Sequence, residues 1–360
     1  MSEARKKAPP TETIAHGASQ LPSVIIDSYN VELHDGDGFI GDRANNRAFR
    51  SIVDSWRERV RSVGDDPLGQ KPTEELSKKK LDKVLAEGEP EAAGVIYGAV
   101  EEFASQLASV VERLLALKAW RGVARIAIGG GLRDSRVGEL AIGRASVVLK
   151  ASGVAIDLAP IHHHPDEAAL IGALHLVPAW MLEGHDAALA VDIGGSNIRA
   201  GIVQLDAPGK QGLVTGGVHE LDLWCHADDK PSPSREDAMR RIHHMLERLV
   251  RHAEKGKLKL APFVGIGCPG VIAADGRIER GGQNLPGNWE SARFNLAREI
   301  RSRLPMIGKH ETTVVIHNDA VVQGLSELPF AQDVEHWAVL TIGTGLGNAA
   351  FTNVRAGVSG

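Results

Sequence analysis

The sequence lacks several features that mark broad classes of protein. Its 360 residues include only two cysteines, Cys225 and Cys268, which cannot form the network of disulfide bridges found in small secreted domains. No apolar run approaches the roughly 20 residues that are needed to span a bilayer. Residues 1–22 lack the apolar core of a secretory signal. We therefore expect a cytoplasmic protein with no membrane partner.

The sequence also has no excess of positive charge. The formal net charge is −5, and the short basic run from Arg5 to Lys7 does not create the field that a nucleic acid requires. The sequence shows no helix-turn-helix and no basic face that could read DNA. We therefore expect no nucleic-acid partner.

Length and composition predict a globular protein of two lobes. A chain of this length can bury two hydrophobic cores, and 43% apolar with 24% charged residues is typical of soluble globular proteins. Only residues 1–22, rich in Lys, Pro, Ser and Thr, are interpreted as a flexible tail. We expect a cleft between the two lobes.

Hydrophobic periodicity predicts alternating helices and strands. In the first half, helices are expected over 103–115, 137–151 and 165–177, and strands over 123–128 and 154–158. In the second half, strands are expected over 187–192, 198–205, 263–267, 312–317 and 337–342, with helices over 235–255 and 291–303. The predicted fold class is α/β.

Two glycine-rich turns between strands suggest a phosphate site. They are AspIleGlyGlySerAsn over Asp192–Asn197 and GlyThrGlyLeuGly over Gly343–Gly347. Glycine lets the backbone approach a phosphate, and successive N–H groups bind anions. Neither turn opens a helix, so neither is a Walker loop or a dinucleotide fingerprint. Each alone is compatible with an ordinary hairpin, but two together favour phosphate binding.

Two aspartates follow strands at positions suited to phosphoryl transfer. Asp192 can hold Mg²⁺ directly or through water, or it can simply cap a turn. Asp319, in HisAsnAspAla, can accept the proton of an attacking hydroxyl, or it can begin a helix as a capping residue. Amides and Trp289 in the segment Gln283–Trp289 suit a sugar, or else form a structural loop.

The set of motifs resembles the ROK family of repressors and sugar kinases, glucokinases among them. The resemblance rests on AspIleGlyGlySerAsn, GlyIleGlyCysProGly (265–270), AsnLeuProGlyAsnTrp (284–289), AsnAsp and GlyThrGlyLeuGly. It implies a two-lobed actin-like ATPase (ribonuclease H-like) fold. It also implies a kinase that transfers phosphate from ATP, with Mg²⁺, to a sugar hydroxyl, and it allows a homodimer.

The resemblance assigns roles to individual residues. Asp319 would be the catalytic base, and Asn284, Asn318 and Gly270 would lie at the sugar. ATP would be bound by Asp192, Gly194, Gly195, Ser196, Asn197, Thr344, Gly345 and Gly347. On the adenosine side it would be bound by Gly129, Gly130 and Gly131 in ArgIleAlaIleGlyGlyGlyLeu (125–132).

The order of the parts departs from the family. A ROK chain continues for a further lobe after the last glycine turn, whereas here the adenosine-side strand and the closing helix AspGluAlaAlaLeuIleGlyAlaLeu (166–174) precede the first turn. We expect a circular permutant. Its second lobe would span 23–165 and 336–360, and its first lobe 166–335.

Two family features are altered. The sugar-binding GluXGlyHis is absent as such, and GluLeuHisAspGly (32–36) makes Glu32 and His34 candidate sugar ligands. The cysteine-rich zinc loop is missing, so we expect no structural zinc. HisHisHis (162–164) is interpreted as a solvated loop, because only His162 and His164 could share a face and a metal site needs more ligands.

Two other functions fit the same residues. A sugar-sensing regulator with little catalysis would explain the altered GluXGlyHis. A kinase that uses polyphosphate or another nucleotide would also fit, because nothing in the glycine turns recognises a base. The sequence does not choose the sugar.

Overall fold

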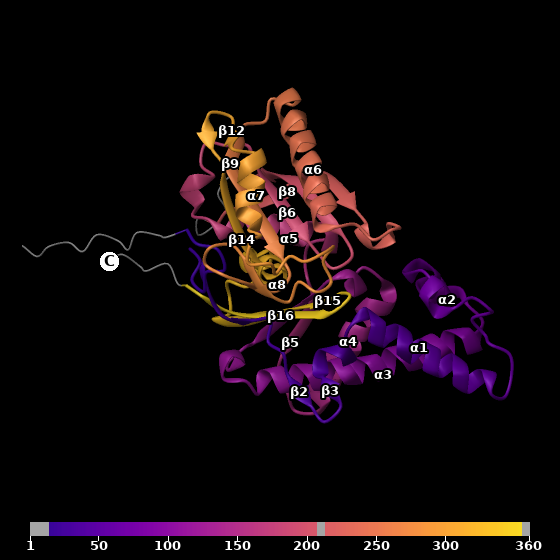
Figure 1. Cartoon of the computed structure of the whole chain (residues 1–360). Helices are drawn as coiled ribbons and strands as arrows, with labels where there is room; N and C mark the ends of the chain where they lie inside the picture. Colours follow the sequence, from indigo (N-terminus) through magenta and orange to yellow (C-terminus); the bar gives the residue numbers. More distant parts are fainter. Residues whose placement is uncertain (1–13, 207–212, 355–360) are drawn as a thin grey trace, which may run out of the picture.

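The computed structural model describes residues 14–206 and 213–354. Two five-stranded sheets lie on either side of a central pair of helices, and further helices cover the outer faces (Figure 1). Within the described residues, no helix is both long and apolar enough to cross a membrane.

The first sheet has the strand order β8-β7-β6-β9-β14. Its strands are β6 (Ala187–Ile193), β7 (Ile198–Leu205), β8 (Gly216–Trp224), β9 (Leu260–Cys268) and β14 (Thr313–Asn318). β6, β9 and β14 are parallel, whereas β7 and β8 are antiparallel to their neighbours. Every residue of β6 is buried, as expected for a central strand covered on both faces.

The second sheet repeats this topology in the order β1-β16-β15-β4-β5. Its strands are β1 (Val24–Tyr29), β16 (Leu346–Asn353), β15 (His336–Ile342), β4 (Arg125–Gly129) and β5 (Asp157–Pro160). β15, β4 and β5 are parallel, and β16 and β1 are antiparallel to their neighbours. The two sheets confirm the predicted α/β fold class, with one sheet in each lobe.

The second sheet takes its strands from both ends of the described chain. β1 pairs with β16 so that Val24 lies opposite Asn353, and the N–H of Val354 donates to the carbonyl of Ser23 at 3.1 Å. The corresponding edge of the first sheet is formed by β7 and β8, which are consecutive in the chain.

Two short helices lie between the sheets. They are α5 (Pro165–Gly172) and α8 (Asp319–Leu325), and they pack against each other. The outer face of the first sheet is covered by α6 (Arg235–Lys255) and α7 (Leu296–Arg303), whose apolar residues share one core with it. The helix predicted over 165–177 corresponds to α5, which ends earlier, at Gly172. A 3-10 turn follows it over Ala173–Leu176.

The outer face of the second sheet is covered by α3 (Pro90–Leu115) and α4 (Arg136–Ala151). Beyond α3 lie α1 (Asn46–Arg61) and α2 (Lys78–Glu87), at the lower right of Figure 1. The remaining strands form three ribbons: β2 (His34–Asp35) with β3 (Gly38–Phe39), β10 (Val271–Ile272) with β11 (Ile278–Arg280), and β12 (Met306–Ile307) with β13 (His310–Glu311).

The segment before β1 is ordered from residue 14 onward. The N–H of Gly17 donates to the carbonyl of Ile316 at 3.0 Å, and the N–H of Ile316 donates to Nδ1 of His16 at 3.2 Å. Leu21 is buried. Within the predicted tail, His16 and Gly17 are therefore bonded to β14, and Leu21 packs into the body of the protein. Residues 1–13 and 355–360 of the predicted tail and second lobe lie outside the described residues.

A buried arginine organises the loop between α1 and α2. Arg57 is 0% exposed, and its Nε donates to Asp66 at 3.0 Å. Its terminal nitrogens donate to Thr73 Oγ1 at 2.6 Å and to the carbonyls of Gly69 and Lys71 at 2.9 and 2.7 Å. One guanidinium thus satisfies four acceptors from the loop that leads into α2.

We expect Arg57→Met to destabilise the protein by about 2 to 4 kcal/mol, because it leaves two loop carbonyls without donors and removes one of the two arginines that bind the Asp66 carboxylate. Urea unfolding at pH 7 measures the effect. Arg59→Met is the matched control, since Arg59 is exposed and bonds only to Ser55. Equal stabilities of the two variants would contradict the role given to Arg57.

Candidate functional site

A cleft of about 510 Å³ lies between the two lobes, which is a typical size for a small-molecule site. Its walls come from both sheets and from the first residues of α5 and α8. The cleft therefore lies where the two repeated sheets face each other.

The two glycine turns meet inside this cleft. The first connects β6 to β7 and the second connects β15 to β16, so they occupy equivalent places in the two sheets. Ser196 Oγ and Thr344 Oγ1 lie 2.9 Å apart. Gly194, Gly195, Ser196, Asn197, Thr344, Gly345 and Gly347 all line the cleft, as do Gly130 and Gly131. Phosphate oxygens placed here would face backbone N–H groups from both lobes.

Asp319 begins α8 directly after β14 and lines the cleft. Its Oδ1 accepts from the N–H of Ala320 at 2.9 Å. Burial, together with the nearby charge of Asp192, raises the pKa of Asp319 to about 7. A carboxyl group with such a pKa can take up a proton near neutral pH, as a general base must.

Asp192 is held by an arginine that the sequence did not single out. Arg199 on β7 donates to Asp192 Oδ2 at 3.0 Å and to Asp166 Oδ1 at 2.6 Å. Burial raises the pKa of Asp192 although Arg199 opposes that shift. Among the described residues, no hydrogen bond uses Asp192 Oδ1, so this oxygen is available to a cation or a water molecule.

Three predicted sugar-side residues lie in the same cleft: Asn284, Gly270 and Glu32. A Cβ on Gly195 would lie 3.0 Å from that of Asn284, so the two segments touch. Gly270 has φ +95°, and a Cβ there would lie 2.1 Å from the carbonyl oxygen of Arg280. This position therefore requires glycine.

Asn318 has a different place from the one predicted. It is 1% exposed and caps α8, since its Oδ1 accepts from the N–H groups of Ala320 and Val321. Its Nδ2 donates to the carbonyl of Gly270 at 3.0 Å. It is not among the residues that line the cleft. The oxygen and one N–H of this amide are therefore used by neighbouring groups, and these bonds orient Gly270 and the first residues of α8.

Three further residues fall outside the lining of the cleft. His34 is exposed on β2, with its ring 5.6 Å from that of Phe39. Gly129 gives room to Gln323, whose Oε1 would lie 2.3 Å from a Cβ. Trp289 is 1% exposed and packs on Phe294. The proposed stacking of a sugar on Trp289 is therefore wrong, because its ring is part of the core.

The comparisons with known proteins point to one family. The ROK family model matches residues 188–360. A glucokinase of Thermotoga maritima is 30% identical over 167 residues, which cover 46% of this chain and 44% of that enzyme. The match thus spans less than half of the relative's length.

Solved structures give a weaker likeness. A ROK glucokinase of Streptomyces griseus in complex with glucose and AMPPNP is 22% identical, with a TM-score of 0.33, over 48% of this chain and 47% of that one. A ROK hexokinase of Thermus thermophilus is also 22% identical, with a TM-score of 0.33, over 47% of this chain and 49% of that one.

The sequence analysis did not assign several cleft residues to the site, including Asn46, Lys78, His164 and Gln323. They lie outside the ROK motifs and reach the cleft only through the packing of distant elements. His164 was interpreted as part of a solvated loop, but it lies at the cleft, 3.4 Å from Asp134. No group of three or more His, Cys, Asp or Glu within residues 14–206 and 213–354 could hold a metal ion.

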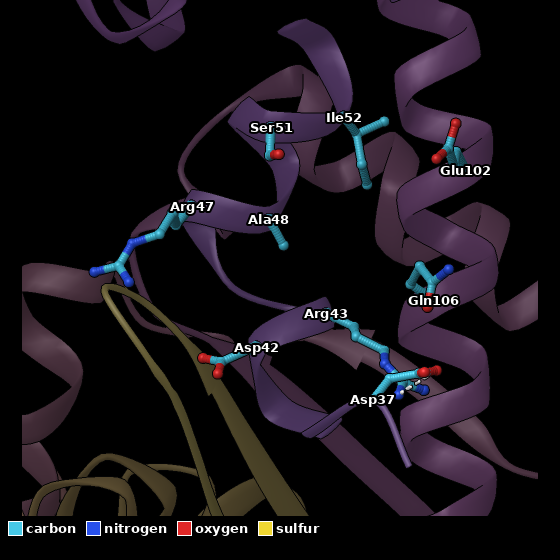
Figure 2. Close-up of a pocket in the computed structure, with 9 residues that line it drawn as sticks. All are labelled: Asp37, Asp42, Arg43, Arg47, Ala48, Ser51, Ile52, Glu102 and Gln106. Carbon is cyan, nitrogen blue, oxygen red and sulfur yellow. Dashed lines mark hydrogen bonds and ion pairs between the residues drawn. The ribbon is translucent and has the colours of Figure 1, made fainter. Parts of the chain in front are cut away.

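A second hollow of about 500 Å³ lies in the second lobe, between α1 and α3 (Figure 2). Arg43 in its lining is paired with Asp35 at 2.5 Å and with Asp37 at 3.3 Å. In Figure 2 the Arg47 side chain is directed away from Glu102 and Gln106 on α3. The hollow shares no lining residue with the cleft, so it does not belong to the ROK motifs.

A buried histidine supports the strand that carries Asp319. His317 is 0% exposed. Its Nδ1 accepts from the N–H of Asn318 at 2.7 Å, so its Nε2 carries the proton and donates to Ala18 at 3.1 Å. Burial lowers the pKa of His317 to about 4. The neutral ring links the segment before β1 to β14.

We expect this histidine to make stability depend on pH. Its folded pKa lies below the unfolded value near 6.5, so its contribution is present above pH 6.5 and is lost as the pH falls toward 4. The full loss corresponds to about 3 kcal/mol. Urea unfolding from pH 7 to 4 should show a gap between wild type and His317→Asn that narrows by that amount. A gap that stays constant with pH would contradict this role of His317. The pKa of His175 is also lowered to about 4, but His175 is present in both proteins and so does not change the gap.

Proposed function

We propose that the protein is a sugar kinase that transfers the terminal phosphoryl group of ATP to a sugar hydroxyl. The observation that carries this proposal is the contact between the two glycine turns, Ser196 to Thr344, beside a buried carboxyl whose pKa lies near 7. A phosphate grip and a base in one cleft are the parts that in-line phosphoryl transfer needs.

In this mechanism Asp319 accepts the proton of the sugar hydroxyl while the hydroxyl oxygen attacks the terminal phosphorus of ATP. The bond to the bridging oxygen breaks, and ADP leaves. N–H groups of Gly194–Asn197 and Thr344–Gly347 hold the phosphates and stabilise the charge that develops on the transferred group. Closure of the lobes excludes water from the reacting atoms.

The charge of the cleft favours Mg²⁺ as a companion of ATP. Five carboxylates line it: Glu32, Asp134, Asp166, Asp192 and Asp319. Only two permanent cations line it, Lys78 and Arg199. A bare triphosphate would be repelled by this excess of negative charge. Mg²⁺ would neutralise phosphate charge, with Asp192 Oδ1 holding it directly or through water. The same excess argues against polyphosphate, which carries more negative charge.

The sugar is assigned to the side of the cleft formed by Gly270, Asn284 and Glu32. These groups offer amide, carbonyl and carboxylate partners for hydroxyls. Asn348 fixes the loop that carries Glu32, because its side chain exchanges two hydrogen bonds of 3.0 Å with the backbone of Val31. Since the Thermotoga maritima relative is a glucokinase, hexoses are the first acceptors to test.

We also infer that the parts are circularly permuted relative to the family. The support is the pairing of β1 with β16 at the edge of the second sheet, where the first sheet has the consecutive strands β7 and β8. Joining Asn353 to Val24 by a short turn would restore an ordinary hairpin.

A sugar-sensing regulator is the second candidate. The observation that favours it is the position of His34, which lies outside the lining of the cleft, so one candidate sugar ligand is unavailable. Calorimetry that detects a sugar, without ADP release in the presence of ATP and Mg²⁺, would support it.

We expect Asp319→Asn to lower kcat by about 10²- to 10⁴-fold, because the general base is removed while the shape of the cleft is kept. A coupled ADP-release assay over a panel of hexoses and N-acetylhexosamines measures it. The control is Asp65→Asn, at an exposed carboxylate in the loop before α2. Near-normal kcat in Asp319→Asn with unchanged folding would refute the assignment.

We expect kcat/KM to fall below about pH 7, by about tenfold per pH unit, because Asp319 must be ionised to accept a proton. Initial rates between pH 5.5 and 8.5 measure this limb. Because acid also destabilises the fold, each sample is returned to pH 7.5 and assayed again. Full recovery together with a flat profile would contradict a base whose pKa lies near 7.

A further inference from the structure

We propose that Lys78 binds the phosphate chain of the nucleotide donor from the second lobe. This inference rests on the proposed function and deepens it by adding a cationic contact that belongs to no glycine turn. It makes α2, together with the start of α1, part of the nucleotide site.

Lys78 lies at the wall of the cleft. It is the first residue of α2, whose capping residue Ser77 accepts from the N–H of Lys80 at 3.2 Å. Its Nζ donates to the carbonyl of Gly131 at 2.5 Å. This carbonyl follows β4, in the glycine run expected on the adenosine side. Lys78 and Gly131 both line the cleft.

The surroundings of Lys78 also include the second glycine turn. A Cβ on Gly131 would lie 3.2 Å from the Nζ of Lys78 and 3.9 Å from the Nδ2 of Asn46. The N–H of Asn46 donates to the carbonyl of Gly343 at 3.0 Å. Asn46 therefore joins Lys78 to the turn that holds Thr344, so the ammonium group lies between the adenosine side and the phosphate side.

The charge of Lys78 is not neutralised. Arg199, the other permanent cation of the cleft, is paired with Asp166 and Asp192. Across the part of the chain that the structure describes, no carboxylate lies within ion-pairing distance of Lys78. An ammonium group has three N–H donors, and Gly131 occupies one of them. An anion in the cleft would complete the set with charge-assisted hydrogen bonds.

The side chain is held in place before any ligand binds. The loop that leads into α2 is fixed by Arg57 and also by Arg50, which donates to the carbonyls of Thr73 and Leu76. Lys79 and Lys80 follow directly on the same helix, but they are exposed and do not line the cleft. They are matched controls with the same charge and the same local helix.

The test compares wild type, Lys78→Met, Lys79→Met and Lys80→Met by titration calorimetry with ATP, ADP and adenosine, all with Mg²⁺. We expect Lys78→Met to weaken ATP and ADP by about 10- to 100-fold, the range for a hydrogen bond to a charged group, and to leave adenosine unchanged. Lys78→Arg should recover part of the affinity. The two control variants should match wild type.

Three outcomes would overturn the inference: unchanged ATP affinity in Lys78→Met, equal weakening of ATP and adenosine, or no binding of ATP by wild type. Thermal melting of each variant shows whether it is folded, and Lys78→Gln is a second variant at the same position. Binding is measured without an acceptor. Failure to phosphorylate any sugar would therefore count against the proposed function, while the nucleotide affinities would still decide the role of Lys78.

Discussion

The ion-pair cluster of Arg199 with Asp192 and Asp166 is the interaction on which the arrangement of the cleft depends. Asp192 ends a strand of the first sheet and Asp166 begins α5, the helix between the sheets, so one guanidinium joins the phosphate turn to the centre of the molecule. Two carboxylates could not lie this close without a counter-charge. The remaining charge of Asp192 contributes to the raised pKa of Asp319. By favouring the ionised form of Asp192, Arg199 therefore also affects the pKa of Asp319, the proposed base.

Both lobes contribute charged groups to the cleft, and the second lobe supplies the carboxylates of Glu32 and Asp134 as well as Lys78. The first lobe supplies carboxylates, at Asp192 and Asp319, where a metal ion and a proton must be held. The second lobe supplies Lys78 beside Gly131, where phosphate charge would otherwise lack a partner. The glycine turns contribute N–H dipoles from both sides. The charged phosphoryl donor is thus bound by favourable charges and N–H dipoles on both sides only when both lobes contact it.

The sequence was informative where function depends on local backbone geometry. Glycine turns after strands, and an aspartate at the start of a helix, are visible as short motifs, and the structure brings Asp192, Ser196, Asp319 and Thr344 into one cleft. Lys78 could not be found in this way, because tertiary packing alone brings it to the cleft, whereas Arg199 lies opposite Asp192 in the hairpin of the first turn, where no motif marked it. Asn318 shows the reverse case: its motif was visible, but capping of α8 and the bond to Gly270 use its amide. Residues 14–22 looked flexible because the bond that holds His16 to Ile316 joins residues 300 positions apart in the chain.

The unusual order of the parts leaves the chemistry intact for a physical reason. The phosphate turns lie within two continuous hairpins, β6 to β7 and β15 to β16, and Asp319 lies at the continuous junction of β14 and α8. The edge where strands from opposite ends of the described chain meet, β1 with β16, is held by an antiparallel ladder and lies at the rim of the second sheet. Hydrogen bonds in such a ladder need the two strands to be adjacent in space but not consecutive in the chain. The cleft therefore depends on which strands are neighbours, and both sheets have the same neighbours although their strands follow different orders along the chain.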